Sequence, residues 1–221
     1  MKRPTTDHRR NAWEKMRETG RRPTDARPAC RRYLIVCEGE KTEPNFFKSL
    51  AETLDWDQVQ VEVDPTGMNT QSLVERARKR KSEKNQLGVA SFDEIWVVFD
   101  RDSFKSDQFD NAIKSAEAAG MKAAWSNEAF ELWYVLHFEF RNSGMSRRDY
   151  RRVLTRHLKQ RYKKNDPEMY DKLEELGNQS LAIRYAKSLD KARIADKQPP
   201  SAANPCTLVY KLVERLQAFE S

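Results

Sequence analysis

Short acidic motifs occur at three places in the sequence, and carboxylates are the side chains that bind hard metal ions. The acids are Glu38 and Glu43 in EGEKTE, Asp100 and Asp102 in FDRD, and Glu128 in SNE. Carboxylates that crowd together raise one another's pKa, and a divalent cation with oxygen ligands removes that cost. Because these motifs offer oxygen ligands rather than Cys or His, we expect Mg²⁺ or Mn²⁺ rather than Zn²⁺.

The spacing of these acids suits metal-assisted chemistry on a phosphate. Asp100 and Asp102 alternate along one segment, so both can reach the same ion while Arg101 points away. Such an ion polarises a phosphoryl oxygen and lowers the pKa of a bound water. A simpler interpretation stays open, because polar residues after a strand often cap the next helix. The candidates for such caps are Asp102, Ser106, Ser126 and Asn127.

Each acidic motif follows a predicted strand. Apolar runs predict buried strands at 31–37 and 94–99, and shorter segments predict strands at 58–63 and 121–125. Helical spacing predicts helices after each of them, at 42–54, 70–85, 106–119 and 127–138. This alternation predicts an α/β fold with a parallel sheet of about four strands and helices on both faces. Since sites lie at the carboxyl ends of parallel strands, we expect the acids to meet at one edge of the sheet.

Two basic regions flank this acidic middle. The chain has 221 residues and a net charge of +7, yet residues 33–145 carry 13 Lys or Arg against 20 Asp or Glu. The pattern predicts a flexible basic arm at 1–30, a catalytic α/β domain at 31–140 and a helical C-terminal region at 141–221. The helices expected in the C-terminal region are 146–163, 167–176, 180–190 and 205–218.

Basic side chains in this sequence are candidates for binding a polyanion. On the helix expected at 146–163, a face can neutralise several phosphates; its residues are Arg148, Arg152, Arg156 and Lys159. Lys41 and Arg101 lie inside the acidic motifs, so we expect them to contact the reacting phosphate. The run RARKRKSEK at 76–84 is explained equally well as a solvated helix face.

Composition excludes several classes of protein. No apolar run approaches the roughly 18 residues of a membrane span, so no membrane association is expected. Three cysteines without CxxC spacing argue against a disulfide scaffold and indicate a reducing, cytoplasmic location. The phosphate-loop pattern GxxxxGK[ST] does not occur, so the chain itself is not expected to hydrolyse ATP.

The segments YLIVCEGEKTEPNFFKSL, EIWVVFDRD and WSNEAFELWYVLHF resemble the RloB-like family of Toprim-domain proteins over about residues 31–140. The resemblance implies a Toprim fold, in which a Glu follows the first strand and an Asp-x-Asp follows the third. Glu38, Asp100 and Asp102 match that pattern. The related OLD-family nucleases add a second acid and a Ser-x-Glu, matched by Glu43 and by Ser126 with Glu128. Because Glu43 lies one residue later than the commonest spacing, Glu40 stays an alternative ligand.

The resemblance also implies roles for these residues. Glu38 would be a metal ligand or the general acid or base, and Asp100 and Asp102 would hold one Mg²⁺. Glu43 and Glu128 would complete that ligand set or hold a second ion, and Glu131 is a candidate for a supporting carboxylate. Lys41 would act beside them in the catalytic set.

The implied function is a Mg²⁺-dependent nuclease that cleaves DNA or RNA, tRNA included, in an antiphage or restriction-associated system. An AAA- or ABC-type ATPase would be its partner, and a homo-oligomer is a further expectation. The alternative is a nucleic-acid-binding or ATPase-partnered regulatory module that has no activity of its own.

Overall fold

The computed structural model describes residues 30–67, 70–87, 90–101 and 105–219. The predicted basic arm lies outside these residues apart from Cys30, and so does Asp102. Among the described residues, no helix combines the length and the apolar character that a membrane crossing requires.

A five-stranded sheet forms the centre of the molecule. Its strands are β1 (Arg31–Cys37), β2 (Val59–Pro65), β3 (Glu94–Asp100), β4 (Lys122–Asn127) and β5 (Cys206–Thr207). They lie in the order β2-β1-β3-β4-β5; the first four are parallel and β5 is antiparallel to β4. The central strands β1 and β3 are buried along most of their length, as expected for strands covered on both faces. The α/β class is therefore confirmed, with one strand more than expected.

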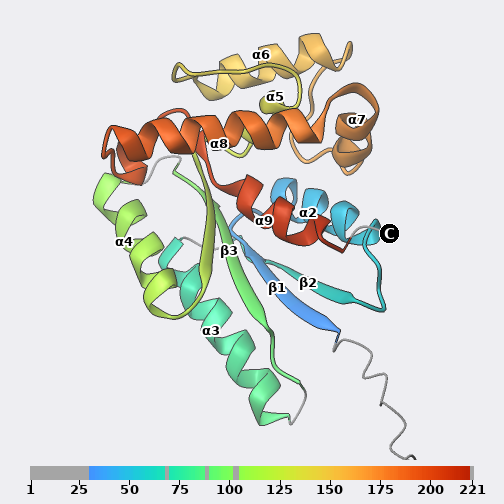
Figure 1. Cartoon of the computed structure of the whole chain (residues 1–221), viewed down its shortest axis with the longest axis vertical. Coiled ribbons are helices and arrows are strands. Elements are labelled where there is room, and N and C mark those ends of the chain that lie inside the picture. The colour runs from blue at the N-terminus through green and yellow to red at the C-terminus, as the bar shows by residue number, and fades with distance from the viewer. Residues whose placement is uncertain (1–29, 68–69, 88–89, 102–104, 220–221) are drawn as a thin grey trace, which may run out of the picture.

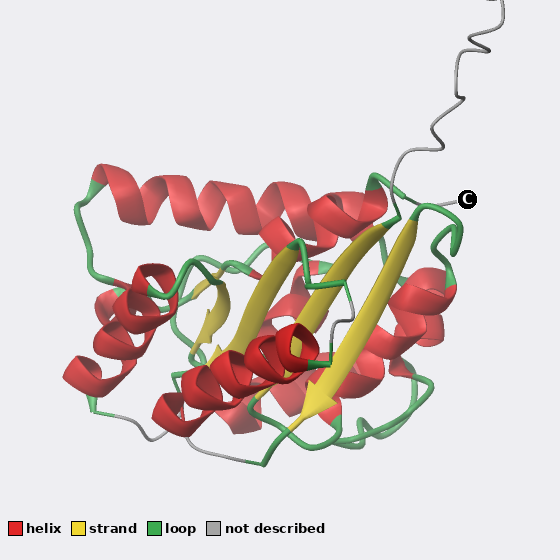
Figure 2. Ribbon diagram, turned by 90° about the horizontal axis from the view of Figure 1, so that it is seen from below, coloured by secondary structure: helices red, strands yellow, loops and turns green. Residues whose placement is uncertain are grey.

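Helices cover both faces of the sheet. Helices α3 (Thr70–Gln86) and α4 (Ser106–Ala118) pack on one face, and α2 (Thr42–Glu52) and α9 (Val209–Gln217) pack on the other (Figure 1). Right-handed crossovers between parallel strands require this division, because the chain runs first from β1 to β2 and then back across β1 to β3 and β4. Figure 2 shows the strands between these helices.

The remaining elements build a helical layer beside the sheet. They are α5 (Glu131–Leu136), α6 (Arg147–His157), α7 (Met169–Leu176), α8 (Gln179–Ala195) and the short 3-10 helix η1 (Pro200–Ala202). An aromatic cluster joins this layer to α2: Phe46 contacts Trp133, Tyr134 and Tyr170 at ring-centroid distances of 5.4–6.3 Å. Trp133 is fully buried, which confirms its assignment to the core.

Two expectations for the C-terminal region are wrong. The helix expected at 146–163 ends at His157, and Lys159 follows with a left-handed φ of 53°. The segment 158–168, here called the basic loop, then crosses to α7 without helical structure. The region is also not entirely helical, because β5 joins the sheet: Ser126 Oγ and Thr207 Oγ1 lie 2.9 Å apart in a buried hydrogen bond.

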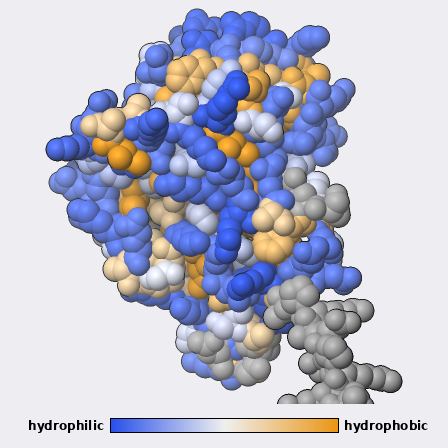
Figure 3. All heavy atoms as spheres, in the orientation of Figure 1, coloured by the Kyte–Doolittle hydropathy of each residue, from blue (hydrophilic) through white to orange (hydrophobic). Residues whose placement is uncertain are grey.

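The basic run of α3 is occupied by ion pairs with β2. Arg76 Nε lies 2.9 Å from Asp64 Oδ2, Arg80 contacts Glu62, and Lys84 Nζ lies 3.3 Å from Glu62 Oε2. These cations neutralise acids of the edge strand, which supports the structural explanation of the run. On the face of the molecule in Figure 3, apolar side chains gather in separate patches among hydrophilic ones.

Candidate functional site

The carboxyl ends of β1 and β3 bring two acidic motifs together. Cys37 pairs with Val98, so the chain leaves both strands at the same edge. The Glu38 backbone N–H donates to the Val98 carbonyl at 2.9 Å, and the Asp100 backbone N–H donates to Glu38 Oε2 at 3.3 Å. Glu38 and Asp100 are therefore direct neighbours although 62 residues separate them in the sequence.

Glu43 enters the same edge from the first turn of α2. A Cβ atom on Gly39 would lie 2.1 Å from Glu43 Oε2, so the carboxylate occupies space that only a glycine leaves open. Glu43 is 7% exposed. Burial raises the pKa of Glu43, and the Glu131 carboxylate adds to the rise, while Lys164 and Arg147 oppose it.

Asp100 is the most perturbed carboxyl group of the site. Burial raises its pKa well above its ordinary value, and the negative charges of Glu43, Glu131 and Glu38 raise it further. Its Oδ1 atom is buried and has no hydrogen-bond partner among the described residues. A buried carboxylate oxygen without a partner is costly, so this atom requires a proton or a cation.

Glu131 and Glu128 come from the segment after β4. Glu131 is 6% exposed and accepts a hydrogen bond from the Tyr162 hydroxyl at 3.3 Å. Burial raises the pKa of Tyr150, and the nearby carboxylates of Glu128, Glu131 and Asp100 add to the rise. Glu128 thus lies at the side of the site that α6 covers. The sequence interpretation missed both tyrosines, because their contacts to the acids are long-range and leave no local pattern.

Glu40 and Glu43 point to different places. Gly67 has a φ of +61°, and a Cβ atom there would lie 2.6 Å from Glu40 Oε1. Glu40 therefore lies against the end of β2, whereas Glu43 acts on the pKa of Asp100. Of the two alternative ligands, Glu43 is the one close to the other acids.

The helix-capping interpretation finds no support in the described residues. Helix α4 has Lys105 at its N-cap and no side-chain cap bond, and α5 has Phe130 at that position. Asn127 Nδ2 instead donates to the carbonyls of Pro200 and Ser201 at 3.0 and 3.1 Å. Ser126 and Asn127 thus fix the C-terminal segment to the sheet.

Lys41 and Arg101 differ in their accessibility. Lys41 is exposed and lines a cavity of about 360 Å³ together with Gly39, Glu43 and Lys164. Arg101 reaches toward α4, where its Nη2 lies 3.4 Å from Ser106 Oγ. Lys41 is the better placed of the two for contact with a ligand in this cavity.

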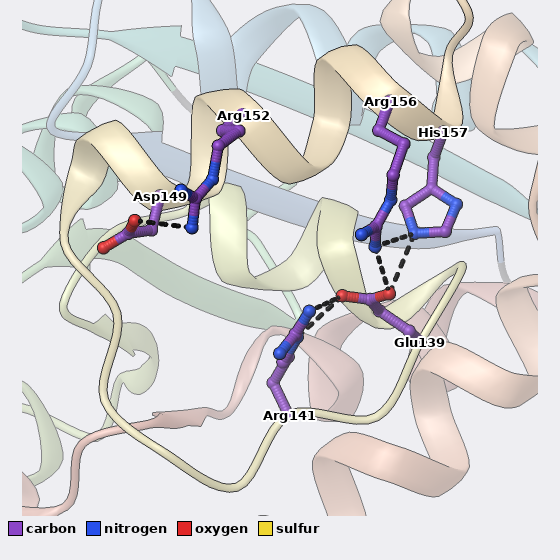
Figure 4. A network of polar contacts seen from close by, with 6 residues as sticks. All are labelled: Glu139, Arg141, Asp149, Arg152, Arg156 and His157. Carbon is purple, nitrogen blue, oxygen red and sulfur yellow. Dashed lines mark hydrogen bonds and ion pairs between the residues drawn. The ribbon is translucent and has the colours of Figure 1, made fainter.

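The residues predicted to bind nucleic acid on α6 are partly engaged with acids (Figure 4). Arg156 Nη2 lies 2.6 Å from Glu139 Oε2, a carboxylate that also contacts Arg141 and His157. Arg152 Nη2 lies 3.2 Å from Asp149 Oδ1. Arg148 and Lys159 are exposed. The predicted face is therefore not a continuous row of available cations.

A second cavity, of about 550 Å³, lies beside α6 and is called here the basic groove. Its cationic lining residues are Arg151, Arg152, Arg161, Lys163 and Lys164. Lys164 also lines the cavity of Glu43. Only Arg152 of this set was chosen from the sequence, because the helix expected at 146–163 would have placed the residues after 157 on other faces.

The donor atoms suit a hard cation, but the ligand set is incomplete. The orphaned Asp100 Oδ1 and the neighbouring carboxylates of Glu38 and Glu43 are oxygen donors of the kind that Mg²⁺ prefers. As the side chains lie, no group of three or more His, Cys, Asp or Glu in the described part of the chain could hold a metal ion. Asp102, a predicted ligand, lies outside that part.

A parallel sheet flanked by helices, with acids at the ends of its first and third strands, agrees with the Toprim-like α/β class. The family model described as RloB-like protein matches residues 33–216. The chain therefore belongs to the RloB-like family, and the matched part includes the C-terminal helices and β5. Searches of curated proteins and of solved structures found no match.

Proposed function

We propose that this RloB-like protein is a Mg²⁺- or Mn²⁺-dependent nuclease that cleaves phosphodiester bonds in DNA or RNA. The observation that carries the proposal is the junction of β1 and β3, where Asp100 has a buried oxygen without a partner beside Glu38 and near Glu43. Perturbed carboxyl groups next to a cavity are typical of catalytic sites rather than of structural acids.

Glu38, Glu43 and Asp100 would hold the metal, with Asp102 and Glu128 as further ligands. A bound divalent ion would polarise the phosphoryl oxygen and lower the pKa of a water. The side chains of this protein have their own parts: Lys41 and Lys164 bind and orient the phosphate, since both line the cavity beside Glu43. Tyr162 holds Glu131 in place through its hydroxyl group.

The cellular setting follows from the family and the composition. We place the protein in the cytoplasm, as the effector of an antiphage system that works with an ATPase. Its three cysteines are free, which suits a reducing compartment. Because the sequence has no phosphate-loop motif of its own, any ATP hydrolysis in the system would come from the partner.

Cleavage and metal binding together test the proposal. The full chain is incubated with supercoiled plasmid or tRNA in Mg²⁺, Mn²⁺ or EDTA, and Mn²⁺ binding is measured by calorimetry without substrate. We expect metal-dependent cleavage and Mn²⁺ binding, both abolished in Asp100→Asn and Glu43→Gln. Glu52→Gln, at an exposed acid on the same helix as Glu43, is the matched control and should change neither.

The alternative is a module that binds nucleic acid without cutting it, and the incomplete ligand set of the described residues favours it. A wild-type chain that binds oligonucleotides but neither binds Mn²⁺ nor cleaves either substrate would establish that alternative. Cleavage that persists in Asp100→Asn would contradict the assigned site.

A further inference from the structure

The basic groove differs from the other cationic surface on α3 in having little neutralisation. The α3 cations pair with Glu62 and Asp64. In the groove, Arg152 has one exposed ion pair with Asp149, and among the described residues no ion pair engages the other four cations. Five positive charges around one cavity repel one another, so an anion bound there removes an existing cost.

The groove owes its shape to the basic loop, which three contacts fix in place. The Tyr162 backbone N–H donates to Thr155 Oγ1 of α6 at 3.0 Å, and the Tyr162 hydroxyl donates to Glu131 at 3.3 Å. Further along, Asn165 Oδ1 accepts from Thr42 Oγ1 of α2 at 2.8 Å. The Tyr162 side chain is 7% exposed, so the loop is anchored at its centre, and Arg161, Lys163 and Lys164 on either side are exposed.

The anchors also connect the groove to the acidic site. Tyr162 binds Glu131, whose charge acts on Asp100 and Glu43, and Asn165 binds the first residue of α2, directly before Glu43. Lys164 lines both cavities and lowers the pKa of Glu43, so its ammonium group lies at the boundary. A chain of phosphates that follows the five cations would thus lead to the carboxylates.

We propose that the basic groove binds the phosphodiester backbone of a nucleic-acid strand and leads it to the acidic site, with Lys164 contacting the phosphate nearest Glu43. The proposal rests on the proposed function only for what happens at the acids; the binding itself does not require cleavage. Phosphate contacts of this kind carry no base specificity and release counterions, so the affinity depends on salt concentration.

Binding is measured by fluorescence anisotropy in EDTA, with single-stranded DNA and RNA oligonucleotides of one sequence. The test variant combines Arg161→Ala, Lys163→Ala and Lys164→Ala, all exposed positions on the basic loop. Each lost contact should lower the salt slope by about 0.7, so the fall in affinity between about 50 and 200 mM salt should shrink roughly 20-fold. Comparison of the two oligonucleotides shows which of the two strands the groove prefers.

The matched control removes three cations from a different cavity. Arg184→Ala, Lys187→Ala and Lys191→Ala on α8 make the same change in net charge, and none of these residues lines the acidic cavity. This control should keep the wild-type salt slope. An equal loss in both triple variants, an unchanged slope in the loop variant, or no binding by the wild-type chain would each overturn the proposal.

Two single variants separate this inference from the proposed function. Asp100→Asn should bind oligonucleotide as tightly as the wild type while it loses cleavage, because Asp100 is not part of the groove. Lys164→Ala should lower kcat at saturating substrate by more than it raises Kd. Binding in the groove without cleavage in any metal would reject the nuclease but keep the inference, whereas cleavage with an unaltered Kd in the loop variant would reject the inference alone.

Discussion

Gly39 and Glu43 are two residues whose relation can be tested by adding a single methyl group. In Gly39→Ala the new Cβ would lie 2.1 Å from Glu43 Oε2. Because that atom is the end of a flexible side chain, the carboxylate can turn away at little cost to folding. We expect a thermal midpoint close to that of the wild type but a loss of Mn²⁺ binding and cleavage, measured by calorimetry and by the plasmid assay.

Gly120→Ala is the contrasting control for this prediction. Gly120 has a φ of +69° and nothing lies within 4 Å of a Cβ atom there. Ala in a left-handed conformation should lower the free energy of unfolding by about 1 kcal/mol and leave metal binding unchanged. The assignment of Glu43 to the site would be refuted if Gly39→Ala also lost stability alone and kept full activity.

His137 should give the protein a marked pH dependence of stability. The imidazole is fully buried, and burial lowers its pKa from 6.5 to about 4. In the unfolded chain the same group binds a proton near pH 6.5, so the unfolded state gains protons first as pH falls, and stability decreases in that direction. Between pH 6.5 and about 4 the loss should approach 3 kcal/mol, about 1.4 kcal/mol for each unit of the shift.

Urea unfolding at several pH values across this window measures the effect. His137→Gln should flatten the curve, even if it lowers stability at every pH. His157→Gln is the control, since His157 is only partly buried, and it should retain the fall. Equal slopes in the wild type and His137→Gln would show that other groups govern acid stability.

At the scale of elements, β5 depends on one buried pair of hydroxyl groups. Thr207→Val keeps the shape of the side chain but leaves Ser126 Oγ without its partner, which should cost about 1–3 kcal/mol. The double variant Ser126→Ala with Thr207→Val removes both polar groups and should recover much of that loss. Chemical denaturation of the three variants measures the coupling, and additive losses would mean that the bond contributes nothing to holding β5.

The elements also show why parts of the structure could be predicted and others could not. Strands β1 and β3 are continuous apolar runs that the sheet buries on both faces, so their sequences carry the signal. The acids beyond them then meet because parallel strands end at one edge. The two residues of β5 are too few to show any periodicity.

The basic loop was misread for a different reason. Lys, Arg and Gln are good helix formers, and no Gly or Pro interrupts the sequence before Pro167. The helix nonetheless ends at His157, where the chain turns so that the Tyr162 ring is buried and its hydroxyl reaches Glu131. A contact over 31 residues overrides local propensity and cannot be read from local sequence. The same limit hid the groove.

At the scale of the whole molecule, the region expected to fold as a domain at 31–140 relies on partners from the C-terminal region. Tyr33 of β1 stacks edge-on against Phe219, Phe46 of α2 against Tyr170, and β4 pairs with β5. We expect the fragment 31–140 to show no cooperative thermal transition by circular dichroism, whereas the fragment 30–219 unfolds cooperatively. A cooperative transition of the shorter fragment would show that it is an autonomous domain.

The position of β5 has a consequence for how the protein is made. Ser126 and its partner Thr207 lie 81 residues apart, so β4 presents an open edge to the ribosome surface and to chaperones throughout the synthesis of that interval. The sheet closes only when nearly all of the nascent chain has emerged, because the strand that completes it comes next to last among the elements. A translational pause before residue 206 would prolong the aggregation-prone stage, and a holdase that masks strand edges would be most useful then.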